Sequence, residues 1–281
     1  MQAQEPRRAV APLPILGAMT TADDTIVTVD GDTVVKIHRA GTNPQELAAR
    51  LRIASGSGCL LTPLSVDPEA ITAIGGERWR TRWPRITPIP QFPGALPWSE
   101  AGALLATLHR EPIPAGVDIP DHGAVRSLRR ALDALPVGAP PAVRQAAAAL
   151  PPRAWRTATL GRPVTVVHGD FHLGQLGRAA DDRVLLFDVD DLGAGDPAWD
   201  LARPAGFWAS GLIPDVDWRA FLTAYRRGGG PAVPAAGDPW PALEPHACAA
   251  VVQAAAAGSA RAARDETQAA LVAACARMPP R

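Results

Sequence analysis

Two polar sequence motifs, each placed directly after a short apolar run, constrain this chain more than any other feature. HGDFHLGQ occupies residues 168–175 and follows the β-branched run 164–167. DVDDLGAGDPAWD occupies residues 188–200 and follows the apolar run 184–187. Runs of this kind favour short strands. The turn-forming residues 178–183 between the motifs then predict that the two strands form a hairpin.

Such a hairpin would bring three oxygen-bearing side chains together. Asp170 and Gln175 lie in the first motif, and Asp188 opens the second. Because a hairpin places its flanking loops close together, we expect these three side chains at one edge. Carboxylate and carboxamide oxygens suit a hard divalent cation such as Mg²⁺, and a further carboxylate can act as a general base.

The two linked motifs resemble those of the aminoglycoside phosphotransferase and choline kinase-like family of small-molecule kinases. The family pattern is His-Gly-Asp, four residues, Asn, then a hydrophobic strand that ends in Asp and a Gly-Asp-Pro-x-x-Asp-Leu tail. Residues 168–170, Asp188 and residues 195–201 match it in order and spacing. Gln175 stands where most members have Asn, although the similar maltokinase-like sugar kinases also carry a His-Leu-Gly-Gln ending. A linked pair of motifs is a far more specific signal than an isolated His-Gly-Asp.

The resemblance implies an α+β, protein-kinase-like fold with two lobes. A small nucleotide-binding lobe with an antiparallel sheet would span residues 1–88, and a larger, mostly helical lobe would span residues 89–281. The resemblance also implies that Asp170 accepts or orients the proton of an acceptor hydroxyl. Asp188 and Gln175 would hold Mg²⁺ on the phosphates of ATP. The change from Asn to Gln leaves the geometry of a second metal site open.

The N-terminal lobe offers a candidate phosphate-binding lysine. Alternating β-branched residues on both sides of an Asp-Gly turn at residues 30–31 predict a hairpin with Lys36 in its second strand. Asn43 and Pro44 then open a helix that carries Glu46 in its first turn. By resemblance, Lys36 binds the α- and β-phosphates and Glu46 orients it. Taken alone, Lys36 fits an edge strand or solvent face, and Glu46 fits stabilisation of the helix N-terminus through the macrodipole.

A glycine-rich phosphate loop is missing before Lys36. Residues 17–24 contain a single glycine. This glycine-poor segment and Gln175 favour an alternative interpretation, a pseudokinase that binds nucleotide as a regulator without turnover. The presence of Lys36, Asp170 and Asp188 opposes that interpretation, because a decayed enzyme usually loses one of these three first.

Several polar residues near the motifs are expected to have structural roles. His168 would brace its loop. By resemblance, the segment that carries Asp196 and Asp200 braces the loop of Asp170, and an Asp followed by Pro at a helix start is ordinary capping chemistry. His109 lies at the end of a predicted helix and fits a capping role. Residues 190–191 either face substrate or metal, or are solvated loop acids.

The remaining chain predicts a connector followed by helices. The Pro-rich residues 84–97 would join the lobes. The resemblance implies that adenine lies against this connector and bonds its backbone. Apolar spacing predicts helices at residues 99–110, 125–135, 142–150, 217–226, 245–263 and 265–277.

Composition argues against several classes of protein. The 281 residues include 28 basic and 28 acidic side chains, without the basic excess of a nucleic-acid binder. Zero net charge also argues against a strongly cationic acceptor. Three cysteines in no zinc-binding spacing suit a reducing cytoplasm better than a disulfide framework. No apolar segment is long enough to span a membrane. We therefore expect a cytoplasmic protein with neither nucleic-acid nor membrane partners.

The sequence thus predicts an ATP- and Mg²⁺-dependent kinase that phosphorylates a hydroxyl of a small molecule. A sugar or amino sugar is the first expectation for the acceptor, and an aminoglycoside is the second. A metal-dependent hydrolase, a third class, would need metal-ligating histidines besides His172.

Overall fold

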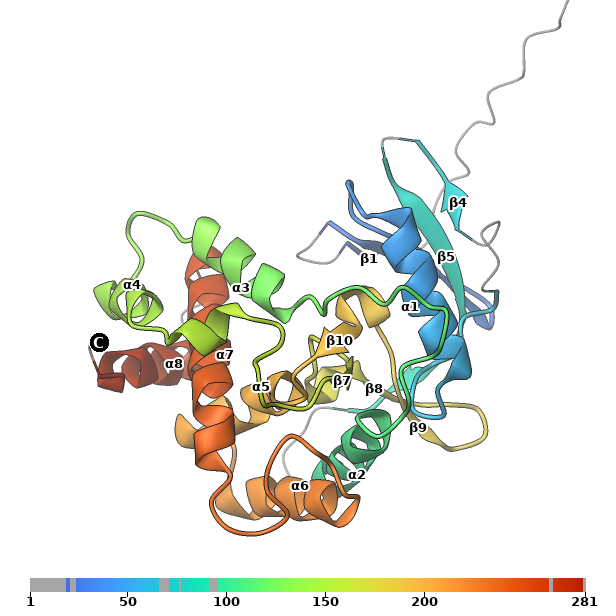
Figure 1. The fold of residues 1–281 in the computed structure, drawn as a ribbon. Helices are drawn as coiled ribbons and strands as arrows, with labels where there is room; N and C mark the ends of the chain where they lie inside the picture. Colours follow the sequence, from blue (N-terminus) through green and yellow to red (C-terminus); the bar gives the residue numbers. More distant parts are fainter. Residues whose placement is uncertain are drawn as a thin grey trace, which may run out of the picture.

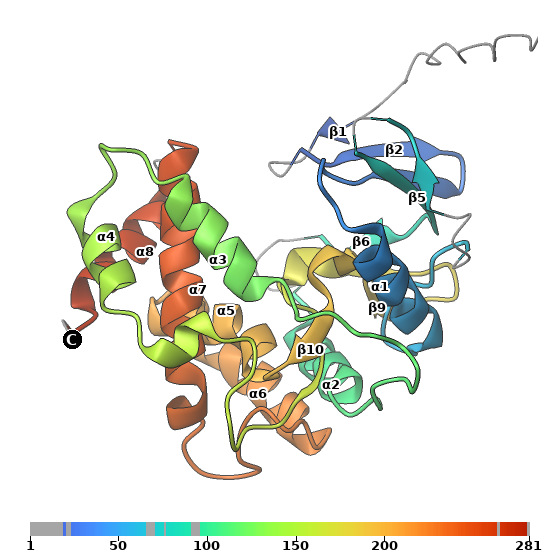
Figure 2. The same cartoon turned by 45° about the horizontal axis from the view of Figure 1, so that its top comes forward.

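The protein has a small sheet-containing lobe and a larger helical lobe (Figures 1 and 2). The computed structural model describes residues 19–20, 24–65, 71–75, 77–90, 96–262 and 265–279. In both views the blue and teal sheet and helix α1 lie on one side, and helices α3 to α8 extend away from them. The α+β, kinase-like architecture predicted from the sequence is confirmed.

The small lobe is built on an antiparallel sheet whose five described strands run in the order β1-β2-β3-β5-β4. In β2 and β3 the alternating β-branched residues pair from Ile26 with Ile37 to Asp30 with Thr33, which confirms the predicted hairpin. Lys36 in β3 pairs with Val27 of β2 and with Thr81 of β5, so it lies in an interior strand and not at an edge. The strands are β1 (Met19–Thr20), β2 (Ile26–Asp30), β3 (Thr33–Ile37), β4 (Thr72–Ala73) and β5 (Trp79–Pro84).

Helix α1 (Pro44–Gly56) begins where the sequence predicts. The side chain of Asn43 caps it by accepting hydrogen bonds from two backbone amides of the first turn, including that of Glu46 at 3.3 Å. Leu47 and Leu51 are fully buried on its inner face. This apolar face fixes α1 against the rest of the molecule.

The short strands that support the two motifs pair differently from the prediction. β7 (Thr165–Val167) pairs with β10 (Gly193–Gly195), and the hairpin is formed by β8 (Leu176–Arg178) and β9 (Val184–Leu186). The predicted pairing of residues 164–167 with residues 184–187 is therefore wrong. The three-residue β8 contains a glycine and shows no alternation that would mark it as a strand. β6 (Thr87–Pro88) also pairs with β8, so it does not belong to the N-terminal sheet. It lies at the end of the predicted N-terminal lobe, residues 1–88.

The large lobe consists of helices that follow the predicted order. α2 packs on α6 and α5 packs on α7. α7 begins five residues before the predicted start at residue 245, because the proline there lies inside the helix and not in its first turn. Among the described residues, no helix combines the length and apolarity needed to cross a bilayer. The helices are α2 (Trp98–Leu108), α3 (Ala124–Asp133), α4 (Pro141–Ala148), α5 (Ala198–Ala209), α6 (Asp215–Arg227), α7 (Trp240–Ala260) and α8 (Glu266–Arg277).

Candidate active site

Asp200 in α5 fixes the backbone of the loop that carries Asp170. Its buried carboxylate accepts hydrogen bonds from the amides of His168 at 2.7 Å and Gly169 at 2.9 Å. Gly169 has a φ of +84°, and a Cβ at this position would overlap the carbonyl oxygen of Asp191. Glycine is therefore required here for two reasons, the left-handed backbone and the close approach. The predicted bracing role of Asp200 agrees with these contacts.

A second buried group holds Asp200 in place. His109 donates through Nε2–H to the Asp200 carboxylate at 3.0 Å and contacts the Tyr225 hydroxyl through Nδ1 at 2.8 Å. Burial would raise the pKa of Asp200, but the hydrogen bond and charge of His109, with the Gly169 amide, hold this pKa below its ordinary value. His109 does occupy the C-cap position of α2, as predicted. Its side chain, however, belongs to a buried hydrogen-bond network with Asp200 and Tyr225, next to the loop that carries Asp170.

His168 links the two motifs directly. Its Nε2 lies 2.9 Å from the carbonyl oxygen of Phe187, the residue before Asp188. His168 is fully buried, so this bond fixes the relative position of the loop after β7 and the loop after β9. The bracing role predicted for His168 fits this contact.

Asp170 projects from the fixed loop with a partly exposed side chain. Its Oδ1 accepts a hydrogen bond from Nη2 of Arg203 at 2.9 Å. Arg203 lies three residues after Asp200 on α5, and residues at this spacing share a helix face. One helix therefore carries both the residue that holds the loop and the residue that contacts its carboxylate. Sequence reasoning missed Arg203, although this spacing was available as a signal.

Lys36 joins the small lobe to the second motif. Its Nζ lies 2.5 Å from Oδ1 of Asp188 and 2.9 Å from Oδ1 of Asp190, and Nδ1 of His38 lies 3.2 Å from the same Asp190 oxygen. Burial lowers the pKa of Lys36, but attraction to the two carboxylates outweighs burial and raises it above its ordinary value. Burial likewise opposes ionisation of Asp190, but Lys36 and His38 hold the pKa of Asp190 well below its usual range. Asp190 is thus part of an ion-paired cluster and not simply a solvated acid.

Asp188 has an unusual backbone conformation. Its φ of +66° and ψ of +71° lie in the left-handed region, which is uncommon for a residue other than glycine. Such conformations cost free energy and concentrate at functional sites. The conformation aims the Asp188 carboxylate at Lys36.

Glu46 does not contact Lys36, which differs from the expectation for a lysine-orienting glutamate. Its Oε2 pairs with Nη2 of Arg50 one turn later on α1, at 2.9 Å. Nε of Arg50 then donates to the carbonyl oxygen of Leu192 at 2.8 Å. The carboxylates that do pair with Lys36 come from Asp188 and Asp190. Glu46 is therefore linked to Leu192, in the second motif, through Arg50.

The pairing of β8 with β9 brings the backbones of Gln175 and Asp188 near each other, because Gln175 precedes β8 and Asp188 follows shortly after β9. The amide of Phe187 donates to the backbone oxygen of Gln175 at 3.0 Å, which extends the ladder to the ends of both strands. Carboxylate and carboxamide oxygens are the kind of ligand that suits Mg²⁺, an ion often held by one or two protein side chains together with substrate phosphates. In the described parts of the chain, no group of three or more His, Cys, Asp or Glu side chains is arranged to hold a metal.

Asp191 faces the start of α3. Its Oδ2 accepts a hydrogen bond from the Ser127 hydroxyl at 2.9 Å, and Arg126 lies 3.6 Å from Oδ1. Burial and the nearby Asp170 carboxylate raise the pKa of Asp191, against the effect of Ser127, Arg126 and Arg130. Ser127 and the arginines of α3 were not identified from the sequence, because no local pattern links them to Asp191, which lies 64 residues after Ser127.

A match over most of the chain identifies the family. A family model described as "Phosphotransferase enzyme family" matches residues 24–246, which include both motifs and Lys36. The chain belongs to this phosphotransferase family. The family comprises small-molecule phosphotransferases, so the protein is assigned to the transferases with an alcohol group as acceptor. No curated protein matches the sequence at a significant level.

Solved structures support the same fold at low sequence identity. A choline/ethanolamine kinase family protein from Mesorhizobium loti is 22% identical, with a TM-score of 0.55 and coverage of 95% of this chain and 86% of that one. Choline kinase LicA from Streptococcus pneumoniae is 13% identical, with a TM-score of 0.62 and coverage of 94% and 95%. Macrolide 2′-phosphotransferase MphH from Brachybacterium faecium is 18% identical, with a TM-score of 0.51 and coverage of 94% and 93%. At these identities the likeness concerns the fold.

Proposed function

We propose that this member of the phosphotransferase family is a cytoplasmic kinase that uses ATP and Mg²⁺ to phosphorylate a hydroxyl of a sugar, amino sugar or aminoglycoside-like acceptor. The observation that carries the proposal is the cluster of Lys36 with Asp188, which joins the small lobe to a loop braced against that of Asp170. A lysine from the sheet, a metal-binding acid and a general base are the parts that phosphoryl transfer requires.

Each of these residues has a distinct role in the proposed reaction. Asp170 orients the acceptor hydroxyl and accepts its proton, and Lys36 neutralises charge on the α- and β-phosphates. Asp188 and Gln175 would hold Mg²⁺, which supplies charge neutralisation on the nucleotide phosphates when it is bound. Arg203 keeps the Asp170 carboxylate in place. Because phosphoryl transfer demands little covalent chemistry from the protein, positioning and charge neutralisation supply most of the rate.

Glu46 has an indirect place in the nucleotide site. It pairs with Arg50, and Arg50 binds the carbonyl oxygen of Leu192. In the proposed function this pair holds α1 against the segment that delivers Asp188 and Asp190 to Lys36. Glu46 thus supports nucleotide binding without touching the lysine.

The charges next to Asp170 disfavour an acceptor that carries several positive charges. Asp170 is already paired with Arg203, and Asp191 with Ser127 and Arg126. A polycationic acceptor would find these carboxylates neutralised by arginine, and it would be repelled by the same arginines. This supports a sugar over an aminoglycoside, in agreement with the zero net charge of the chain.

Nucleotide binding with and without Mg²⁺ tests the proposed site. We expect calorimetry to show that ATP binds more tightly with Mg²⁺ present, and that Asp188→Asn removes most of this difference. Lys36→Ala should weaken the binding of ATP about tenfold or more in both conditions, because it removes a charge-assisted contact to phosphate. Asp181→Asn, in an exposed loop, is the matched control and should behave as the parent. Unchanged ATP affinity in both Lys36→Ala and Asp188→Asn would contradict the assignment.

A further inference from the structure

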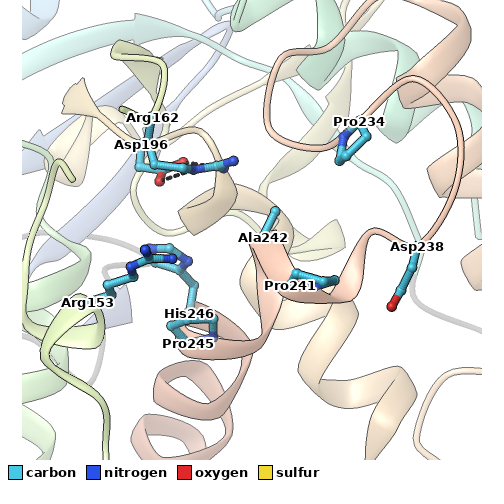
Figure 3. A pocket seen from close by; sticks show the side chains of 9 residues that line it. All are labelled: Arg153, Arg162, Asp196, Pro234, Asp238, Pro241, Ala242, Pro245 and His246. Atoms are coloured by element: carbon cyan, nitrogen blue, oxygen red, sulfur yellow. Dashed lines mark hydrogen bonds and ion pairs between the residues drawn. The ribbon is translucent and has the colours of Figure 1, made fainter. Parts of the chain in front are cut away.

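A cavity in the helical lobe lies apart from the catalytic loop. It has a volume of about 300 Å³ and is lined by Arg153, Arg162, Asp196, Asp238, His246 and several prolines (Figure 3). This volume lies at the lower end of the range for small-molecule pockets. Asp196 follows β10 at the end where Gly195 pairs with Thr165, whereas the catalytic loop follows β7 at the opposite end of the same ladder. The cavity therefore does not belong to the site of phosphoryl transfer.

His246 gives the cavity a polar group without a hydrogen-bond partner. The residue is 2% exposed, and neither ring nitrogen makes a hydrogen bond among the described residues. Its ring is held edge-on against Trp199, with 4.9 Å between the ring centroids. The Asp196 carboxylate and the Ala242 carbonyl one helical turn earlier attract a proton on the ring, but neither has the geometry of a hydrogen bond to a ring nitrogen. A buried imidazole normally satisfies its donor and acceptor, so this one is available to a ligand.

The second available group is the guanidinium of Arg153. It is exposed at the rim and makes neither a hydrogen bond nor an ion pair within the part of the chain that the structure describes. Arg162, in contrast, is committed to Asp196 through two hydrogen bonds of 2.8 Å and 2.9 Å. Figure 3 shows Arg153 and His246 on one side of the cavity and Asp238 on the other. The side with Arg153 therefore carries an uncompensated positive charge.

We propose that this cavity binds a small molecule through an anionic oxygen group, a carboxylate or a phosphate, held by Arg153 and His246. The fork of N–H groups on Arg153 matches the oxygens of either anion, and the imidazole N–H adds a second donor. The Arg162–Asp196 pair lines the cavity without adding net charge. The proposal concerns binding and is independent of the phosphotransferase reaction.

Titration of the His246 ring signals by NMR tests the proposal on the full-length protein. The probes are inorganic phosphate, citrate as a carboxylate, and glucose as an uncharged control. The His246 resonances are assigned by their loss in His246→Gln and by their contact with the Trp199 ring, so the assignment does not depend on one variant. Arg153→Gln is the test variant, and Arg219→Gln, an exposed arginine on α6, is the matched control.

We expect a saturable shift of the His246 signals with phosphate or with citrate, and the more strongly binding probe identifies the anion. In Arg153→Gln the dissociation constant should rise about tenfold or more, and in Arg219→Gln it should not change. The absence of a saturable shift with both anions would overturn the proposal. So would equal binding in Arg153→Gln and the parent, or a response to glucose alone.

Discussion

The guanidinium of Arg203 lies 2.9 Å from the carboxylate of Asp170, while Asp200, one turn earlier on α5, accepts hydrogen bonds from the backbone of the same loop. A single helix thus positions both the main chain and the side chain of the proposed general base.

Replacing Arg203 by Gln should lower kcat about tenfold to a hundredfold, because Asp170 loses the partner that fixes its orientation. The KM for ATP should stay unchanged, since Arg203 contacts the base and not the Lys36 cluster. Arg203→Lys should restore part of the activity. Steady-state kinetics with Arg219→Gln as control measures this split. A parallel rise in the KM for ATP would show instead that Arg203 supports the nucleotide site.

Replacing Asp200 by Asn should destabilise the fold by about 3 kcal/mol, because the buried carboxylate serves two backbone amides and His109. An amide cannot accept all of these bonds, and its NH₂ group would be buried against donors. Urea unfolding measures the free-energy change, with the exposed Asp181→Asn as a control that should unfold as the parent does. Equal stability of Asp200→Asn and the parent would contradict the structural role of Asp200.

Acidification should destabilise the protein through His246. Burial lowers the pKa of this histidine from 6.5 to about 4 in the folded chain. The unfolded chain therefore binds more protons between these values, so the free energy of unfolding is highest above pH 6.5 and falls as the pH drops toward 4. The total loss attributable to this group is about 3 kcal/mol.

His246→Gln removes this contribution and should make the dependence of stability on pH less steep. Urea unfolding of parent and variant in two buffers, one above and one well below the ordinary pKa of histidine, gives the difference. Since all other titrating groups are shared, the difference between the two chains isolates His246. The same loss of stability on acidification in both would contradict the assignment.

The motifs were sufficient to predict the fold. The spacing of residues 168–175 and 188–200 predicted a kinase-like fold, and the family match confirms it. Short-range patterns also predicted the Lys36 hairpin and the start of α1, because turn and capping chemistry depends on neighbouring residues. The assignments of Asp170, Asp188, Gln175, Lys36 and Glu46 to chemical roles stay predictions until the experiments are done.

Contacts between distant segments could not be predicted. The predicted pairing of β7 with β9 was wrong because a three-residue strand such as β8 leaves no periodic signal in the sequence. The pairing of Lys36 with Asp190, and the hydrogen bond from Arg50 to the carbonyl oxygen of Leu192, depend on how β3 and α1 pack against the second motif. The cavity at His246 likewise arises from segments that meet only in three dimensions.

The most direct test of the proposed kinase activity is acceptor-dependent release of ADP from Mg-ATP across a panel of sugars, amino sugars, aminoglycosides and choline-like alcohols. We expect release with a sugar or amino sugar. In Asp170→Asn we expect a loss of about a hundredfold or more in kcat with ATP affinity retained. ADP release that is unchanged in Asp170→Asn would contradict the assigned general base. ATP binding without release for any acceptor would favour the pseudokinase interpretation, and failure to bind ATP at all would overturn the proposed function.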